Sequence, residues 1–221
     1  MRSAEDVIRF RARCAEEIES EAQADFYVEC YQSGVPRTFW DVRGDNFTAQ
    51  HSALKKVQRY CARRRRVLSN GYSLLLMGDN GVGKTMLLSY VLTQMIRRGS
   101  TVYYTTLAQL DADIKRGFND VEAERRLEFL LESDFLAVDE IGKEHFKTES
   151  YLNTRLEALL KRRYDDGDPC LLATNLDFGA LCRSYGRSLQ SMWEGKYQCL
   201  ILETGDFRAA AKAKMSKDLG A

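Results

Sequence analysis

The sequence lacks the features that would place it in a membrane or outside the cell. No run of about 18 apolar residues occurs, whereas a helix needs roughly 20 to span a bilayer. Residues 1–6 contain no apolar core of the kind that a secretory signal requires. Only 2 prolines and 15 glycines are present, which leaves little room for a long disordered linker. We therefore expect a cytoplasmic protein with no membrane segment.

The cysteine pattern and the net charge exclude two further classes. The 6 cysteines stand singly and none forms a C-x-x-C pair, so a zinc site is not expected. In a reducing compartment such thiols pack as small hydrophobic groups. The formal net charge is +1, so the chain as a whole is no polycation, and any contact with nucleic acid must come from a local patch. The hydrophobic fraction of 44% is ample for one buried core.

The most informative segment is the glycine-rich run 78–85, which matches the pattern G-x-x-x-x-G-K-[ST]. Residues 72–77 before it predict a buried strand and residues 85–98 after it predict a helix, the context that this phosphate-binding loop requires. Backbone N–H groups would surround a phosphate, Lys84 would add a positive charge, and the helix N-terminus would add its dipole. A nucleoside triphosphate is therefore the expected ligand. The residues expected to contact it are Gly78, Asp79, Asn80, Gly81, Val82, Gly83, Lys84, Thr85 and Met86.

From residue 72 onward, strand-like apolar runs alternate with helical periodicity. Further strands are predicted over 101–105, 135–138, 170–173 and 199–202, and helices over 121–133 and 149–164. Thr106 and Gln109 have the spacing of a capping box that opens another helix. Strands that alternate with helices predict an α/β protein with a parallel sheet.

Two adjacent carboxylates end the predicted strand 135–138. Since ligands of α/β proteins bind at the carboxyl ends of the strands, we expect these side chains beside the phosphate loop. Asp139 would hold Mg²⁺ together with the Thr85 hydroxyl, and Glu140 would act as general base on the attacking water. A water-activating carboxylate argues against a small-molecule kinase. Asn175, at the tip of the next strand, could sense the γ-phosphate, although an asparagine there is also a common turn residue.

Two helical regions precede the phosphate loop. Residues 1–33 are acidic and are set apart by the breaking run 34–36, and they could pack on their own domain or dock on another protein. Residues 51–67 predict a basic helix with no acidic residue, which could be an ordinary solvated face or a patch that neutralises phosphates. Its basic residues are Lys55, Lys56, Arg59, Arg63, Arg64, Arg65 and Arg66.

The ordered set of residues 78–85, 138–140, Asn175 and Arg208 resembles the AAA+ ATPases. More narrowly, the segments 135–142, 173–176, 106–118 and 205–208 are similar to those of replicative helicase loaders of the DnaC/DnaI type and of the related IstB-type transposition helpers. The resemblance covers about residues 36–210. It implies a three-layer AAA+ P-loop core with a parallel sheet over residues 35–221, little or no C-terminal lid, and a short helical arm over residues 1–34.

The resemblance also implies an activity. Such a protein hydrolyses ATP to ADP with Mg²⁺, docks through its arm on a DnaB-type replicative DNA helicase, forms a homo-oligomer there, and helps to place the helicase on single-stranded DNA. In that scheme Lys84, Glu140 and Asn175 act in catalysis, and Arg208 is a second sensor of the nucleotide. Two alternatives stay open, a transposition helper that acts on duplex DNA and a nucleotide-switched scaffold with negligible turnover.

Two places depart from the pattern of these loaders. Asp79 and Asn80 stand where loaders commonly have proline or lysine, but binding should survive because backbone N–H groups hold the phosphates. The loaders also insert an arginine finger into the neighbouring subunit's site, and that position falls near Ser191. Arg187 or Arg183 could replace it. If neither does, self-assembly would not stimulate hydrolysis, which slightly favours the scaffold.

Overall fold

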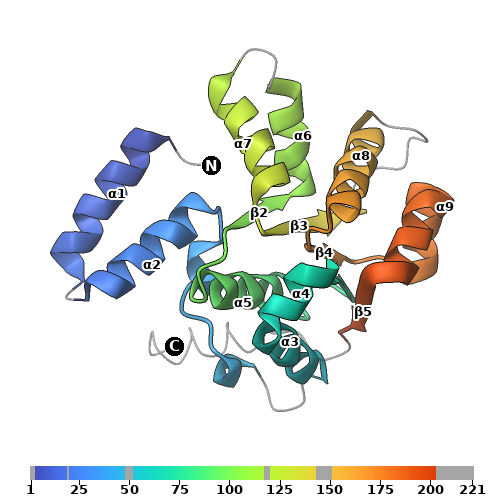
Figure 1. Ribbon diagram of the computed structural model, residues 1–221, viewed down its shortest axis with the longest axis horizontal. Helices are drawn as coiled ribbons and strands as arrows, with labels where there is room; N and C mark the ends of the chain where they lie inside the picture. Colours follow the sequence, from blue (N-terminus) through green and yellow to red (C-terminus); the bar gives the residue numbers. More distant parts are fainter. Residues whose placement is uncertain (1–2, 19, 48–51, 117–119, 143–150, 203–221) are drawn as a thin grey trace, which may run out of the picture.

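Parallel strands form one sheet at the centre of the protein (Figure 1). The computed structural model describes residues 3–18, 20–47, 52–116, 120–142 and 151–202. The strands are β1 (Ser73–Met77), β2 (Val102–Thr106), β3 (Phe135–Ile141), β4 (Cys170–Thr174) and β5 (Tyr197–Ile201). Their order is β2-β3-β4-β1-β5, and every neighbouring pair is parallel. The predicted parallel α/β sheet is therefore confirmed.

Helices cover both faces of this sheet, because its central strands are apolar on both sides. Leu74 and Leu76 pack in one cluster with α5, whereas Leu75 and Met77 pack in a second cluster on the opposite face. The helices concerned are α5 (Lys84–Ile96) on the first face, and α6 (Leu107–Arg116), α7 (Val121–Glu132), α8 (Tyr151–Asp166) and α9 (Phe178–Lys196) on the second. The three-layer α/β core expected from the sequence is confirmed.

The acidic N-terminal segment packs on the first of these faces. It comprises α1 (Ala4–Glu17) and α2 (Glu21–Gln32), followed by the short 3-10 helices η1 (Arg37–Phe39) and η2 (Gly44–Asn46). Phe10 of α1 stacks on Tyr31 of α2 with ring centroids 4.4 Å apart. The Arg97 guanidinium, just after α5, lies 3.7 Å from the ring centroid of Phe26 in α2. Figure 1 shows α2 beside α5 with α1 outside it. The segment therefore packs on its own core, and a domain boundary at residue 34 stays a prediction.

The basic segment forms two helices rather than the single helix predicted over residues 51–67. α3 (Ser52–Ala62) and α4 (Arg64–Asn70) are separated at Arg63, whose φ of −101° and ψ of 28° leave the helical range. α4 ends at Gly71, which takes the left-handed conformation with a φ of 64°. Val57 and Tyr60 of α3 are buried in the cluster that contains α5, so the basic side chains face outward.

Two other local features differ from expectation. The Thr106 hydroxyl accepts a hydrogen bond from the Gln109 N–H at 3.2 Å, but the Gln109 side chain donates to Asp113 instead of closing the capping box. α9 was not among the predicted helices, and its course breaks at Gly186 with a φ of 83° and a ψ of 176°. Within the described ranges, no helix combines the length and apolarity needed to cross a bilayer.

Candidate nucleotide-binding site

The phosphate loop joins β1 to α5 and depends on glycine at several positions. Gly78, Gly81 and Gly83 have φ values of 144°, 89° and 89°, which residues with a side chain rarely adopt. A Cβ atom at position 78 would lie 2.4 Å from the carbonyl oxygen of Leu202. Gly83 is the N-cap of α5, and no side chain caps the first turn of that helix. The first-turn N–H groups can therefore bind an anion.

Lys84 lies inside the loop, with only 8% of the residue exposed. Its Nζ donates hydrogen bonds to the carbonyl oxygens of Gly78 and Asp79, both at 2.7 Å. The ammonium is a point charge on a flexible stem, so a small rotation can carry it from these carbonyls to a phosphate oxygen. The backbone of the loop thus holds the positive charge where the sequence predicts the phosphates.

Asp139 is buried beside the loop, with 2% of the residue exposed. Its Oδ2 accepts hydrogen bonds from the Thr85 hydroxyl at 2.6 Å and from the Tyr104 hydroxyl at 3.0 Å. Its Oδ1 accepts a hydrogen bond from the Glu140 N–H at 2.8 Å. Burial, and next the Asp139 carboxylate, raise the pKa of Tyr104 well above its ordinary value, so this phenol stays a donor. These contacts satisfy a carboxylate whose burial would otherwise be costly.

Glu140 is exposed although its neighbour Asp139 is buried. The predicted strand ends at Val138, before the two carboxylates. In the structure β3 continues to Ile141, and its pairing with β4 shifts between Val138 and Ile141. Such an irregularity re-aims consecutive side chains. Glu140 has a φ of 63°, the one positive value among the non-glycine residues that the structure describes. This backbone directs one carboxylate inward and the next outward.

Asn175 directly follows β4 and contacts the phosphate loop. Its Nδ2 donates a hydrogen bond to Oδ1 of Asn80 at 3.0 Å. The contact follows from the strand order, because β4 lies next to β1 and parallel strands end at the same edge. The structure therefore brings Asn175 to the loop, and its role as a γ-phosphate sensor stays a prediction. Asn80 is one of the two loop residues that differ from the pattern of the resembled loaders. Its side chain has a structural role here, because it links the loop after β1 to the residue after β4.

Thr85 and Asp139 offer the oxygen atoms that Mg²⁺ prefers. One hydroxyl and one carboxylate, 2.6 Å apart, fit an ion that takes few protein ligands and completes its shell with water and phosphate oxygens. Within the described residues, no group of three or more His, Cys, Asp or Glu side chains gathers to hold a metal.

The predicted arginines lie on α9 or beyond it. Arg183 and Arg187 are both exposed, and Gly186 breaks the helix between them. Ser191, the position at which the resembled loaders carry the finger, is exposed as well. Exposure is what an arginine needs in order to reach a neighbouring subunit. Arg208 lies outside the described residues.

Sequence reasoning missed two tyrosines beside the site. Tyr104 bonds to Asp139, and the Tyr185 hydroxyl on α9 accepts a hydrogen bond from the Gly142 N–H at 3.1 Å. Tyr104 stood in a predicted strand, but only the pairing of β2 with β3, which sets Thr106 opposite Asp139, shows that its ring reaches the carboxylate. No local pattern in the sequence indicates that contact.

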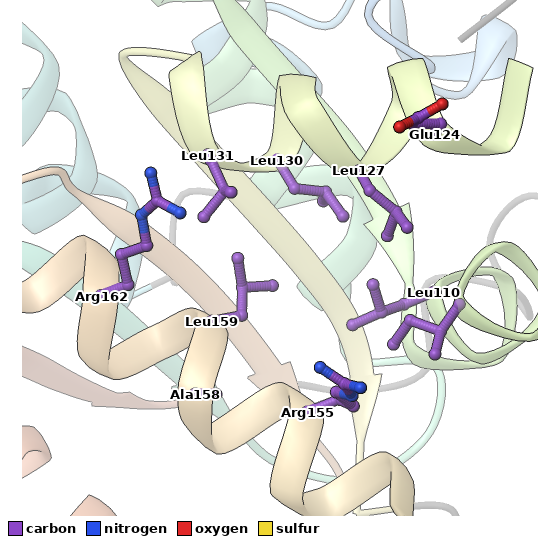
Figure 2. Close-up of a pocket in the computed structure, with 10 residues that line it drawn as sticks. Leu110, Glu124, Leu127, Leu130, Leu131, Arg155, Ala158, Leu159 and Arg162 are labelled. Carbon is purple, nitrogen blue, oxygen red and sulfur yellow. The ribbon is translucent and has the colours of Figure 1, made fainter. Parts of the chain in front are cut away.

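Away from the phosphate loop, a hollow of about 460 Å³ lies between α6, α7 and α8 (Figure 2). Leu127 and Leu130 of α7 point into it opposite Leu159 of α8, with Arg155 and Arg162 also among its lining residues. The lining is mostly aliphatic and includes none of the residues predicted to bind the nucleotide. The nucleotide site is therefore assigned to the phosphate loop.

Comparison with known proteins gives consistent results. The family model "IstB-like ATP binding protein" matches residues 42–189. The replicative helicase loader DnaC of Buchnera aphidicola is 26% identical over 187 residues, which cover 82% of this chain and 75% of the relative. The putative ATP-binding protein of insertion sequence IS5376 from Geobacillus stearothermophilus is 28% identical over 107 residues, which cover 48% of this chain and 41% of the relative. A crystal structure of the DnaC helicase loader has a TM-score of 0.67 at 18% identity and covers 76% of this chain and 100% of that one.

The region matched by the family model contains the residues that the structure gathers around the phosphate loop. It spans more than half of the chain and runs from before β1 to the second half of α9. The structural likeness independently supports an AAA+ fold. The chain therefore belongs to the IstB-like ATP-binding proteins, which are AAA+ proteins of the DnaC/IstB type.

Proposed function

We propose that this protein is an ATPase that helps to load a DnaB-type replicative helicase onto single-stranded DNA. The observation that carries the ATPase part is the hydrogen-bonded set at one edge of the sheet. Thr85 contacts Asp139, Asn80 of the loop contacts Asn175, and Lys84 is held by the loop carbonyls. The relatives named DnaC support the loading part.

Each residue of this set has a proposed role. The first turn of α5 and Lys84 bind the β- and γ-phosphates. Thr85 and Asp139 hold Mg²⁺, which when bound neutralises charge on the phosphate oxygens. Glu140 accepts the proton of the attacking water. Asn175 contacts the γ-phosphate or that water. Arg187 would act on a neighbouring subunit in a homo-oligomer, and Arg208 would sense the nucleotide in its own.

Glu140→Gln tests the hydrolytic role. The amide keeps the size of the side chain but cannot accept a proton, so phosphate release should fall by about 10²- to 10⁴-fold while nucleotide binding persists. Glu128→Gln, on the exposed surface of α7, is the matched control and should hydrolyse like the wild type. Equal turnover by both variants would refute the assignment. No turnover in the wild type, with or without DNA and helicase, would instead support the scaffold.

Docking on the helicase is assigned to the exposed side of the N-terminal arm. Deleting residues 1–34 would remove buried residues such as Phe26 from the hydrophobic cluster that the arm shares with α5, and is therefore a poor test. Ile8 on α1 is 68% exposed and contributes little to the core, so Ile8→Glu should keep the fold and weaken co-purification with a DnaB-type helicase. Val121→Glu is the matched control, since Val121 is 66% exposed at the start of α7. Equal helicase recovery with both variants would overturn the docking role of α1.

The IS5376 relative supports a second candidate, a helper of DNA transposition. Such a protein should assemble on duplex DNA with ATP and retain a transposase. A loader should prefer single strands and retain a replicative helicase. Co-purification of each partner from a defined mixture, with ATP present, separates the two functions.

A further inference from the structure

A basic hollow of about 610 Å³ lies where β1 and β5 start, at the opposite end of these strands from the phosphate loop. Its positively charged lining residues are Lys56, Arg59, Arg63, Arg66 and Lys196. Three tyrosines share the lining, Tyr60, Tyr72 and Tyr197, and none of the described residues that line it is acidic. Since the formal net charge of the whole chain is only +1, this concentration of positive charge is local.

The break between α3 and α4 contributes to the shape of this hollow. Arg59 of α3, Arg63 at the break and Arg66 of α4 all line it, so the two helices present their charges to one concavity. The other wall comes from Lys196, at the end of α9, and the start of β5. In Figure 1, α3 and α4 lie beside β5, which agrees with this arrangement.

The hollow cannot be an extension of the nucleotide site. It is lined by Tyr72 and Ser73, where β1 starts, and by Tyr197 and Gln198, where β5 starts. The phosphate loop begins at Gly78, after the other end of β1. The two sites therefore lie at opposite edges of the sheet, and one ligand does not fill both.

The arginines that support the fold have polar partners for their guanidinium groups, whereas those of the hollow have none among the described residues. Arg64, in the same basic run, donates to Ser100 Oγ at 2.6 Å, and the buried Arg163 donates to backbone carbonyls, among them that of Ser133 at 2.7 Å. Arg126 pairs with Asp113 at 2.8 Å. In the part of the chain that the structure describes, no ion pair or side-chain hydrogen bond engages the charged groups of Lys56, Arg59, Arg63 or Arg66. Several unpaired cations around one hollow repel one another, and a polyanion would relieve that repulsion.

We propose that this hollow binds the phosphate backbone of single-stranded nucleic acid. Arginine recognises phosphate with two parallel hydrogen bonds, and three arginines at different points of the wall can engage successive phosphates. Tyr72 is 43% exposed at the same surface, and an exposed aromatic ring is a stacking platform for an unpaired base. A duplex offers no free base faces to that ring. The proposal extends the proposed function, because it locates the contact with single-stranded DNA away from the ATP site.

The test compares two charge-matched double variants. Arg59→Gln with Arg66→Gln removes two cations of the hollow. Lys55→Gln with Arg65→Gln removes two exposed cations from the same two helices that do not line it. Fluorescence anisotropy with a labelled oligothymidine, at saturating non-hydrolysable ATP analogue, measures affinity as a function of salt. Each phosphate contact contributes about 0.7 to the slope of log affinity against log salt, so the hollow variant should lose about 1.4 in slope. At about 0.1 M salt this amounts to a loss of roughly 25-fold in affinity, with little change in the control.

Further measurements distinguish this proposal from its alternatives. Tyr72→Ala should weaken oligothymidine binding by roughly tenfold while leaving duplex binding unchanged. Equal losses in both double variants, or in neither, would overturn the assignment to the hollow. Preferential binding of duplex DNA, or of vesicles containing anionic lipid, by the wild type but not by the hollow variant would overturn the single-strand assignment. ATP turnover and helicase co-purification are measured on the same preparations. Their loss in the wild type would overturn the proposed function, whereas a loss of oligothymidine binding in the hollow variant alone concerns only the hollow.

Discussion

Replacing Lys84 with methionine should remove most of the nucleotide affinity and leave the fold intact. Methionine has a similar length and no charge, and it suits a position where only 8% of the residue is exposed. The Nζ makes two hydrogen bonds of 2.7 Å to loop carbonyls, which shows that the loop geometry can hold the ammonium tightly. A hydrogen bond to a charged group is worth about 1.5–3 kcal/mol, so losing one net contact to phosphate should weaken binding by about 10- to 150-fold.

A thermal-shift experiment converts this loss into a measurable difference. At a ligand concentration 100 times the wild-type Kd, binding adds about 2.7 kcal/mol to the stability of the wild type. If the variant binds about 100-fold more weakly, the same concentration adds only about 0.4 kcal/mol. For a chain of this size, these values correspond to shifts in Tm of about 5–11 °C and about 1–2 °C. Lys161→Met, on α8, is the control and should shift like the wild type. A full shift in Lys84→Met, measured from its own baseline, would refute the role given to this side chain.

Three further outcomes are expected. Tyr104→Phe removes a hydrogen bond to the buried Asp139 and should lower the free energy of unfolding by about 1.5–3 kcal/mol; an unchanged urea midpoint would contradict it. Gly78→Ala should cost about 1–3 kcal/mol from backbone strain alone, since its φ is 144°, and retention of the wild-type Tm would show that the loop can relax. Burial raises the pKa of the Cys30 thiol from 9.0 to about 12, so this thiol's contribution to stability should be complete below pH 9 and lost as pH rises through about 12. Urea unfolding of wild type and Cys30→Ala from pH 8 to 11 should therefore show a stability difference that shrinks with pH, and a constant difference would exclude that linkage.

The parts of the site that are local in sequence could be predicted. The glycine loop carries its own conformational requirements, and the apolar run before it can only be a buried strand. Asp139 and Asn175 were expected at one edge because parallel strands all end on the same side. Their proximity to the loop needed no knowledge of individual contacts.

The parts that depend on tertiary pairing could not be predicted. The shift between β3 and β4 that separates Asp139 from Glu140 arises from the register of two strands. Tyr104 reaches Asp139 only because β2 pairs with β3. The break at Arg63 divides a run whose composition is uniformly basic, and no residue there signals a helix end.

One missed element did leave a pattern in the sequence. Leu181, Tyr185, Leu189 and Trp193 are all buried and recur every four residues, which is the spacing of a helix face. Gly186 adds a break within the helix, and only the structure shows how far the helix continues beyond it.

The left-handed backbone at Glu140 has a consequence for directed evolution. A residue with a side chain and a φ of 63° pays a conformational penalty, which glycine or asparagine would relieve. Selection for heat resistance alone should therefore enrich glycine or asparagine at position 140, whereas selection for turnover should retain glutamate. The two selections would therefore favour different residues at position 140. The difference in folding stability between the two evolved populations would measure the stability cost of keeping a carboxylate there.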